Sequence, residues 1–385
     1  MQYSPSRRTA LVLCGTGAHG AYHAGVLRAL QEAGVKIDVV AGQGVGAAAA
    51  ILAAIDGGAR LWDADGIWRS RHVKRFYRFN IFRWRRRTRR VIGSLFSRLF
   101  GAPVDPRPAI DAFTGTIWQL IRGASGESSP PREAGRRYAE TLAENLGQPG
   151  FRELMIIATD LDSRSDVVAA LLREPYRREF IAARQGRERR SEALDLAGVG
   201  RDHALDIMAA ALTPPAACEP RLVGFAADSY WRGETHRLCD RPGSIIRLFE
   251  ELAGAGVSQV IVATAAGSSL APHRLRASRL DTRGRLGEFI TASEAAALRD
   301  AGELAHLRFD AFYVVCPSHN PVGPFDFAGA YDEASDRVYS TGELMERGSE
   351  DAYHQFIEPV VGASGDMIGH ASRHADRSRG LPEAQ

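Results

Sequence analysis

The fold of this chain is decided by residues 9–46, which read TALVLCGTGAHGAYHAGVLRALQEAGVKIDVVAGQGVG. The apolar run Thr9–Cys14 predicts a buried strand, and apolar residues at helical spacing predict a helix over Ala21–Ala33 that a glycine ends. A second apolar strand, Ile37–Ala41, leads into a second glycine-rich turn and a helix of small residues, Ala47–Ile55. Two strand–turn–helix units with short loops imply parallel strands and right-handed crossovers. The sequence therefore predicts an α/β fold with a mostly parallel central sheet.

Further elements are expected along the rest of the chain, and they divide it into five segments. Strands or extended segments are expected at Leu154–Leu161, Asp166–Leu172, Arg221–Trp231, Gln259–Ala263 and Phe309–Cys316, and helices within 109–147 and at His203–Leu212, Leu248–Ala255 and Glu343–Pro359. We expect a first part of the core at 7–62, a basic amphipathic insert at 63–108, a helical insert at 109–150, a second part of the core at 151–361 and a disordered tail at 362–385.

The composition indicates an ordinary globular protein in a reducing compartment. The chain has 385 residues, of which 45% are apolar and 25% charged, which argues against wholesale disorder. Its four cysteines form no CxxC pair, so spacing predicts neither a zinc site nor a disulfide scaffold. Residues 1–8 lack an apolar signal region, and no apolar run reaches the roughly 18 residues of a spanning helix. We therefore expect a cytoplasmic protein without a metal or a cofactor.

The charge of the chain is distributed unevenly. The formal net charge is only +3, from 49 Lys and Arg against 46 Asp and Glu. Residues 69–98 hold twelve Lys and Arg and no acid, and removing them leaves 37 bases and 46 acids, a net charge of −9. The sequence thus describes an acidic protein that carries one basic insert.

The basic insert combines arginines with aromatic residues. Its first part, Arg69–Arg90, interleaves bases with Phe and Tyr, and Val91–Phe100 places apolar residues on one helical stripe. This combination is typical of binding to an anionic membrane surface, where each base contributes about 1 kcal/mol. The predicted membrane-binding residues are Arg83, Trp84, Arg85, Arg86, Arg87, Phe96 and Phe100. Two alternatives are an arm that packs on its own domain and a nucleic-acid site, although no nucleic-acid-binding motif accompanies the insert and we expect no nucleic-acid partner.

The two glycine-rich turns allow two interpretations. The first turn, Gly15–Gly20, has the GxGxxG pattern of a dinucleotide site, but that site requires an acid closing the second strand, and Asp38 opens it. The second turn, Gly42–Gly46, has the layout of a nucleophile elbow, in which the central residue stands on a sharp turn at a helix start. A neighbouring glycine loop then supplies the backbone N–H groups of an oxyanion hole. Two such turns 27 residues apart favour the elbow over the dinucleotide site.

On these residues the chain resembles the patatin-like phospholipase family, whose GGGxRG-type loop precedes a GxSxG elbow. Gly15, Gly17 and Gly20 match the loop, while Thr16 replaces its second glycine and His19 stands where Arg or Lys is usual. Thr159–Leu161, Ala209–Pro215 and Arg221–Pro242 resemble later segments of the family, the last one being the segment that holds its Asp-Gly pair. The resemblance implies a three-layer sandwich, an oxyanion loop and an elbow flanked by Gly42 and Gly46. The implied oxyanion residues are Gly15, Thr16, Gly17, Ala18, His19 and Gly20.

The same resemblance implies that both members of the family's Ser–Asp dyad are replaced. Gly44 stands at the nucleophile position, and Arg232 stands at the acid position, one residue before Gly233. We therefore expect a degenerate acyl-hydrolase site whose N–H groups still bind a lipid or fatty acid, with Arg232 adding positive charge. The alternative is an active lipid acyl hydrolase that uses relocated residues. The candidates for that role are Thr16, His19, His23, Asp228, Ser229, Glu234 and His236.

Overall fold

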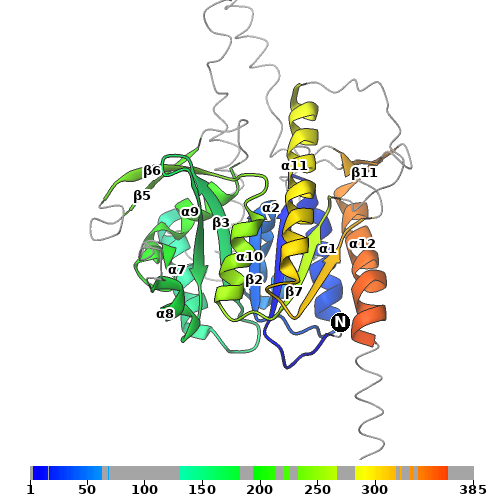
Figure 1. Cartoon of the computed structure of the whole chain (residues 1–385), viewed down its shortest axis with the longest axis horizontal. Coiled ribbons are helices and arrows are strands. Elements are labelled where there is room, and N and C mark those ends of the chain that lie inside the picture. The colour runs from blue at the N-terminus through cyan, green and yellow to red at the C-terminus, as the bar shows by residue number, and fades with distance from the viewer. Residues whose placement is uncertain are drawn as a thin grey trace, which may run out of the picture.

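The strands of this protein form one large sheet and one small one (Figure 1). The structure is a computed structural model, and it describes residues 3–15, 17–62, 68, 131–182, 194–213, 220–225, 233–266, 282–317, 321–322, 330–332 and 337–362. The strands of the large sheet are β1 (Thr9–Gly15), β2 (Val39–Gly44), β3 (Glu153–Asp160), β4 (Ser165–Leu171), β5 (Arg221–Gly224), β6 (Thr235–Cys239), β7 (Gln259–Thr264) and β8 (Ala311–Val315). The small sheet consists of β9 (Pro321–Val322), β10 (Ala330–Asp332) and β11 (Arg337–Tyr339).

The large sheet is parallel at its centre and antiparallel at one side. Its order is β5-β6-β3-β2-β1-β7-β8, and β4 also pairs with β3. The strands β3, β2, β1, β7 and β8 are parallel, whereas β4 and β6 run antiparallel to β3. Because β1 lies between β2 and β7, its carboxyl end meets theirs at one edge of the sheet. Ligands of open α/β sheets bind at this edge.

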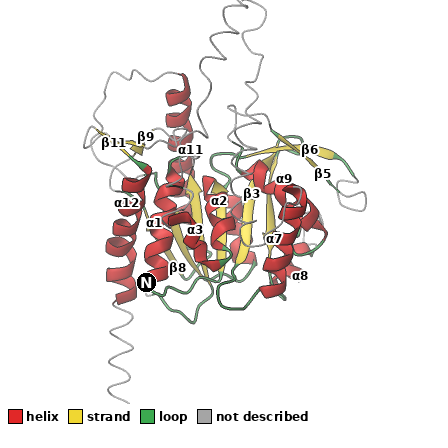
Figure 2. Ribbon diagram, turned by 180° about the vertical axis from the view of Figure 1, so that it is seen from behind, coloured by secondary structure: helices red, strands yellow, loops and turns green. Residues whose placement is uncertain are grey.

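Helices cover both faces of the large sheet (Figure 2). They are α1 (His19–Glu32), α2 (Val45–Ala53), α3 (Ala59–Trp62), α7 (Pro131–Asn145), α8 (Tyr176–Ile181), α9 (Ala204–Ala211), α10 (Ile245–Gly254), α11 (Thr282–Ala305) and α12 (Thr341–Ala352). Short turns of other helix types lie at Asp56–Gly58, Val199–His203 and Tyr353–Gly362. Buried side chains of α1, α2, α7, α9 and α12 share one core with the sheet, and those of α8, α10 and α11 share the other.

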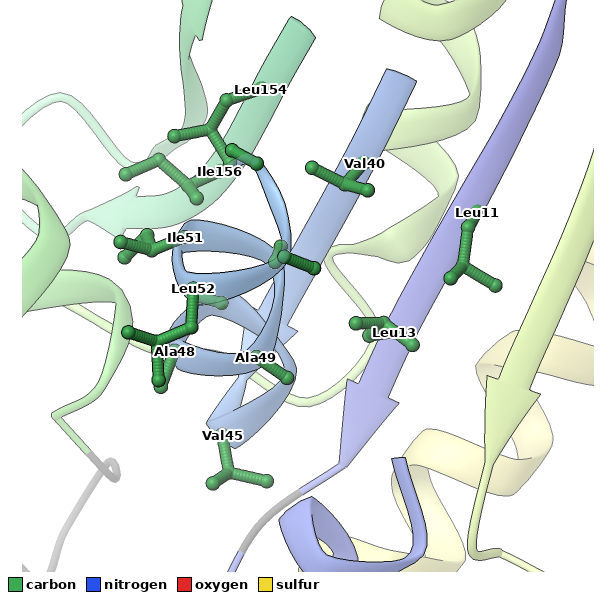
Figure 3. Close-up of a cluster of buried hydrophobic side chains, with 14 of the residues drawn as sticks. Leu11, Leu13, Val40, Val45, Ala48, Ala49, Ile51, Leu52, Leu154 and Ile156 are labelled. Carbon is green, nitrogen blue, oxygen red and sulfur yellow. The ribbon is translucent and has the colours of Figure 1, made fainter. Parts of the chain in front are cut away.

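The two cores follow from the alternation of side chains along each strand. Leu11 and Leu13 of β1 enter the first core, while Val12 enters the second. Figure 3 shows the first core around α2, where Ile51 lies beside Ile156 of the neighbouring strand β3. The expected α/β fold, with helices on both faces of a mostly parallel sheet, is thus confirmed.

Some elements differ from those that the sequence predicts. The longest described helix, α11, and the strand β6 were not expected. Of the expected extended segment Arg221–Trp231, the structure describes residues 221–225, which include the strand β5. Of the helices expected within 109–147, the structure describes α7, which enters the first core through Tyr138 and Leu142. The tail from residue 363 onward lies outside the described residues. The charged, glycine-interrupted start of α11, TRGRLG, lacks the apolar periodicity from which a helix is predicted.

Candidate functional site

Gly44 lies at the sharp junction between β2 and α2. It is the last residue of β2, and α2 begins at the next residue, Val45. Its backbone angles, φ 58° and ψ −133°, fall in a region that L-residues adopt only with strain and that suits glycine. A Cβ atom placed on Gly42 would collide with the carbonyl oxygen of Gly46, and one placed on Gly46 would collide with that of Leu13. The three glycines of this turn therefore allow a strand and a helix to meet without an intervening loop.

The first glycine turn lies directly beside Gly44. Gly15 ends β1 and pairs with Gly44 in the parallel register of β1 and β2. A Cβ atom placed on Gly44 would collide with the carbonyl oxygen of Gly15, so the two turns are in close contact. Gly17 has φ 57°, and α1 begins at His19 after Ala18, whereas Thr16 lies outside the described residues. The structure thus brings together the two turns that the sequence singled out.

Gly20, in the first turn of α1, is covered by a tryptophan. A Cβ atom placed on Gly20 would collide with the indole ring of Trp68 and lie 2.9 Å from a methyl group of Val45. Trp68 is 2% exposed, and its carbonyl oxygen accepts a hydrogen bond from Thr341 at 3.0 Å. This contact places Trp68, a residue of the predicted basic insert, against the first turn of α1.

The carboxylate that faces Gly44 belongs to Asp240, which the sequence did not single out. A Cβ atom placed on Gly44 would lie 3.0 Å from Oδ2 of Asp240. The Asp240 side chain is 1% exposed, and its Oδ1 accepts a hydrogen bond from the backbone N–H of Arg241 at 2.8 Å. Within the described part of the chain, its Oδ2 has no hydrogen-bond partner. Burial raises the pKa of Asp240 from 3.8 to about 7, although the Arg241 N–H and guanidinium oppose that rise.

The elbow is also tied to the segment that carries Asp240. Nε2 of Gln43, the residue before Gly44, donates a hydrogen bond to the carbonyl oxygen of Arg241 at 2.8 Å. The Arg241 guanidinium in turn pairs with Asp166, its Nε lying 3.1 Å from Oδ1. These contacts hold the Asp240 carboxyl beside Gly44 in a defined orientation.

The acid that the structure places beside Gly44 is Asp240. Arg232, which the resemblance assigns to the acid position, lies outside the described residues, as do Asp228 and Ser229. Asp240 directly follows β6, and Arg241 and Pro242 separate it from the next glycine. An acid that closes a strand within the segment Arg221–Pro242 is the sequence signal that could have identified Asp240.

The histidines that the sequence suggested as relocated catalytic residues are in contact with groups other than Gly44 and Asp240. The His19 ring folds back on the turn, because a Cβ atom placed on Gly15 would lie 2.6 Å from its Nδ1, and Nε2 of His23 lies 3.0 Å from the carbonyl oxygen of Cys14. Burial lowers the pKa of His19 to about 4 and that of His23 to about 3, so both rings are neutral. His236 is held between the carboxylates of Asp160 and Glu234.

The remaining predicted site residues are not placed by the structure. Arg83, Trp84, Arg85, Arg86, Arg87, Phe96 and Phe100 lie outside the described residues. Within the described ranges, no group of three or more His, Cys, Asp or Glu side chains is arranged to hold a metal ion. Among the described helices, none has both the length and the apolar character that crossing a membrane requires.

Comparison with known proteins identifies the family of the first half of the chain. VipD from Legionella pneumophila, a solved structure, is similar at a TM-score of 0.36 and 12% sequence identity, over 92% of this chain and 67% of that chain. No curated protein matches the sequence. The family model described as patatin-like phospholipase matches residues 11–172, which include both glycine turns and the strands β1 to β4. Residues 11–172 of this chain therefore carry a patatin-like phospholipase domain.

Proposed function

We propose that this protein binds a lipid or fatty acid at a patatin-type site whose acyl-hydrolase chemistry is impaired. The observation that carries the proposal is the residue at the elbow, because Gly44 has no side chain to attack an acyl carbonyl. Asp240 faces this position, so a base is present but the nucleophile that it would activate is absent. Of the two groups of a Ser–Asp dyad, this chain thus has a carboxyl group beside the elbow but no serine on it.

Ligand binding needs only the parts of the site that remain. The helix α2 begins directly after Gly44, and the first N–H groups of a helix, which lack an intrahelical acceptor, favour a carbonyl oxygen or an anion. The family to which residues 11–172 belong suggests a lipid as the ligand. A bound acyl group would therefore place its carbonyl at the turns without being cleaved.

The predicted basic insert supports a site of action at a membrane surface. Residues 69–98 carry twelve bases and no acid, and Trp68, directly before them, lies against Gly20 beside the glycine turns. We propose that the protein is cytoplasmic and associates peripherally with an anionic membrane. Flotation with phosphatidylglycerol vesicles should carry the protein upward and lose this effect at high salt, whereas phosphatidylcholine vesicles should not. Equal flotation with both lipids would refute the electrostatic attachment.

A second candidate function is slow hydrolysis without a protein nucleophile. The observation in its favour is that Asp240 has a pKa near neutrality and faces the elbow. Such a carboxylate can take a proton from a water molecule as that water attacks the acyl carbonyl. In this reaction the C–O bond to the alcohol breaks, the alcohol leaves with a proton, and the acid is released.

One set of variants tests both functions. Purified protein is incubated with p-nitrophenyl butyrate and with phospholipid vesicles, as the unmodified chain, as Asp240→Asn, as Gly44→Ser and as Gly44→Ser with Asp240→Asn. We expect background turnover from the unmodified chain, a gain in Gly44→Ser and a loss of that gain in the double variant. Because a serine at this turn collides with the carbonyl of Gly15, circular dichroism and melting temperature must show that each variant folds.

Two outcomes would contradict the proposed function. Turnover by the unmodified chain that is well above a heat-treated control, and that Asp240→Asn abolishes, would establish the second candidate instead. The absence of any copurifying lipid by mass spectrometry, together with no lipid-induced rise in melting temperature, would refute ligand binding itself.

A further inference from the structure

A second buried carboxyl lies close to Asp240. Glu294 of α11 is 6% exposed, and neither of its carboxyl oxygens has a hydrogen-bond partner within the described residues. Burial raises the pKa of Glu294 well above 4.5, and the charge of Asp240 raises it further. The charge of Glu294 contributes in turn to the raised pKa of Cys14, which precedes Gly15. Ala301 and Ala305 of the same helix share the second core with Cys14, so α11 covers the face of the sheet to which the Cys14 side chain belongs.

The segment after Asp240 packs against the same face of α11. A Cβ atom placed on Gly243 would lie 3.2 Å from Cβ of Ala297, which is one turn along the helix from Glu294. Two hydroxyls belong to this seam, that of Ser244 next to Gly243 and that of Thr291, one turn before Glu294. Both side chains are at most 3% exposed, and both hydroxyl oxygens lack a partner within the described residues.

These buried oxygens favour a ligand that donates hydrogen bonds. A buried polar atom without a partner costs roughly 1–3 kcal/mol, and more for a charged one, so native proteins rarely leave several together. The opposite side of the site differs, because α2, which starts directly after Gly44, presents N–H donors there. At pH 8 the Asp240 carboxyl is ionised, so a carboxylate or phosphate bound to those donors would lie beside a like charge. An acyl ester with a free hydroxyl satisfies both sides.

We propose that the polar end of the bound lipid is an uncharged or cationic hydrogen-bond donor, a hydroxyl or an ammonium group, received by Asp240 and Glu294. This inference rests on the proposed lipid binding and narrows its ligand to acylglycerols, long-chain alcohols or long-chain amines, in preference to fatty-acid anions and lipid phosphates. Arg241, the nearby cation, does not reverse this preference, because its guanidinium pairs with Asp166.

The test uses four ligands with the same twelve-carbon chain. Binding of 1-dodecanoylglycerol, dodecylamine, dodecanoate and dodecyl phosphate to the whole protein is measured at pH 8 by calorimetry and thermal shift, below their critical micelle concentrations. We expect the first two to bind at least tenfold more tightly than the two anions. A preference for either anion would overturn the inference and leave lipid binding intact, whereas no binding by any of the four would refute the proposed function.

Two variants of α11 separate the role of Glu294 from effects on folding. In Glu294→Gln the amide keeps the shape of the side chain but loses its acidity, so we expect the preference for dodecylamine over dodecanoate to fall at least tenfold. Glu303→Gln, an exposed position on the same helix, is the matched control and should keep the selectivity of the unmodified chain. If Glu294→Gln fails to fold, Asp240→Asn provides the same comparison. Unchanged selectivity in a folded variant would overturn the inference.

Discussion

The buried carboxyl of Asp240 predicts an unusual gain of stability on its removal. Its side chain is 1% exposed, and its pKa is raised from 3.8 to about 7 chiefly by burial. In the unfolded chain the carboxyl releases its proton near pH 4, whereas in the folded chain it keeps the proton to about pH 7. Between these values the folded state binds more protons than the unfolded state, so the free energy of unfolding falls as pH rises.

The size of this effect follows from the two pKa values. The rise in the Asp240 pKa from 3.8 to about 7 destabilises the fold by about 4 kcal/mol at pH 8 and by about 2 kcal/mol at pH 5, at 1.36 kcal/mol for each pH unit over which the two states differ by one proton. Asp240→Asn removes the titration and keeps an oxygen that can accept the Arg241 N–H. We therefore expect the free energy of unfolding of the variant, minus that of the unmodified chain, to be about 2 kcal/mol larger at pH 8 than at pH 5. Any change in stability that the amide causes equally at both pH values cancels when the two pH values are compared.

Urea unfolding followed by circular dichroism at pH 5 and pH 8 measures the difference directly. Asp300→Asn, an exposed position on α11, is the control and should show the same pH dependence as the unmodified chain. A difference between Asp240→Asn and the unmodified chain that is the same at both pH values would refute the reasoning. It would mean that the Asp240 carboxyl is hydrated and titrates normally.

Two further predictions concern packing and a second titrating group. Gly25→Ala should destabilise the protein by about 2–3 kcal/mol in urea unfolding, because its methyl group would collide with a backbone carbonyl of α12, whereas Gly342→Ala, which meets only a distant hydroxyl, should change little. Burial opposes protonation of His236, but its contacts with Asp160 and Glu234 outweigh it and raise the pKa. The stabilising effect of protonated His236 should be complete below pH 6.5 and lost as pH rises through the raised pKa. A pH dependence of the free energy of unfolding that His236→Gln leaves unchanged would contradict this.

Local patterns were sufficient for the centre of the fold. The strands β1 and β2, the helices that follow them and the glycine turns between them come from continuous runs of apolar residues and from glycines at positions with unusual backbone angles. The helix α11 was not predicted, because its sequence does not alternate clearly between apolar and polar faces. The place of α11 in the fold follows from its contacts with the second core, which it makes through Ala301 and Ala305.

The α/β fold, the glycine turns and the glycine at position 44 can be read from the sequence alone, since each of these depends on neighbouring residues along the chain. The acid that faces Gly44 and the buried carboxyl near that acid become visible in the folded structure. Asp240 is far from Gly44 in sequence and reaches it through the strand order of the sheet, and the packing of α11 brings Glu294 toward the segment that carries Asp240. Burial of a carboxyl group and its distance from a second carboxyl both depend on how separate helices and strands pack together. The spacing of residues within one helix or strand therefore does not reveal them.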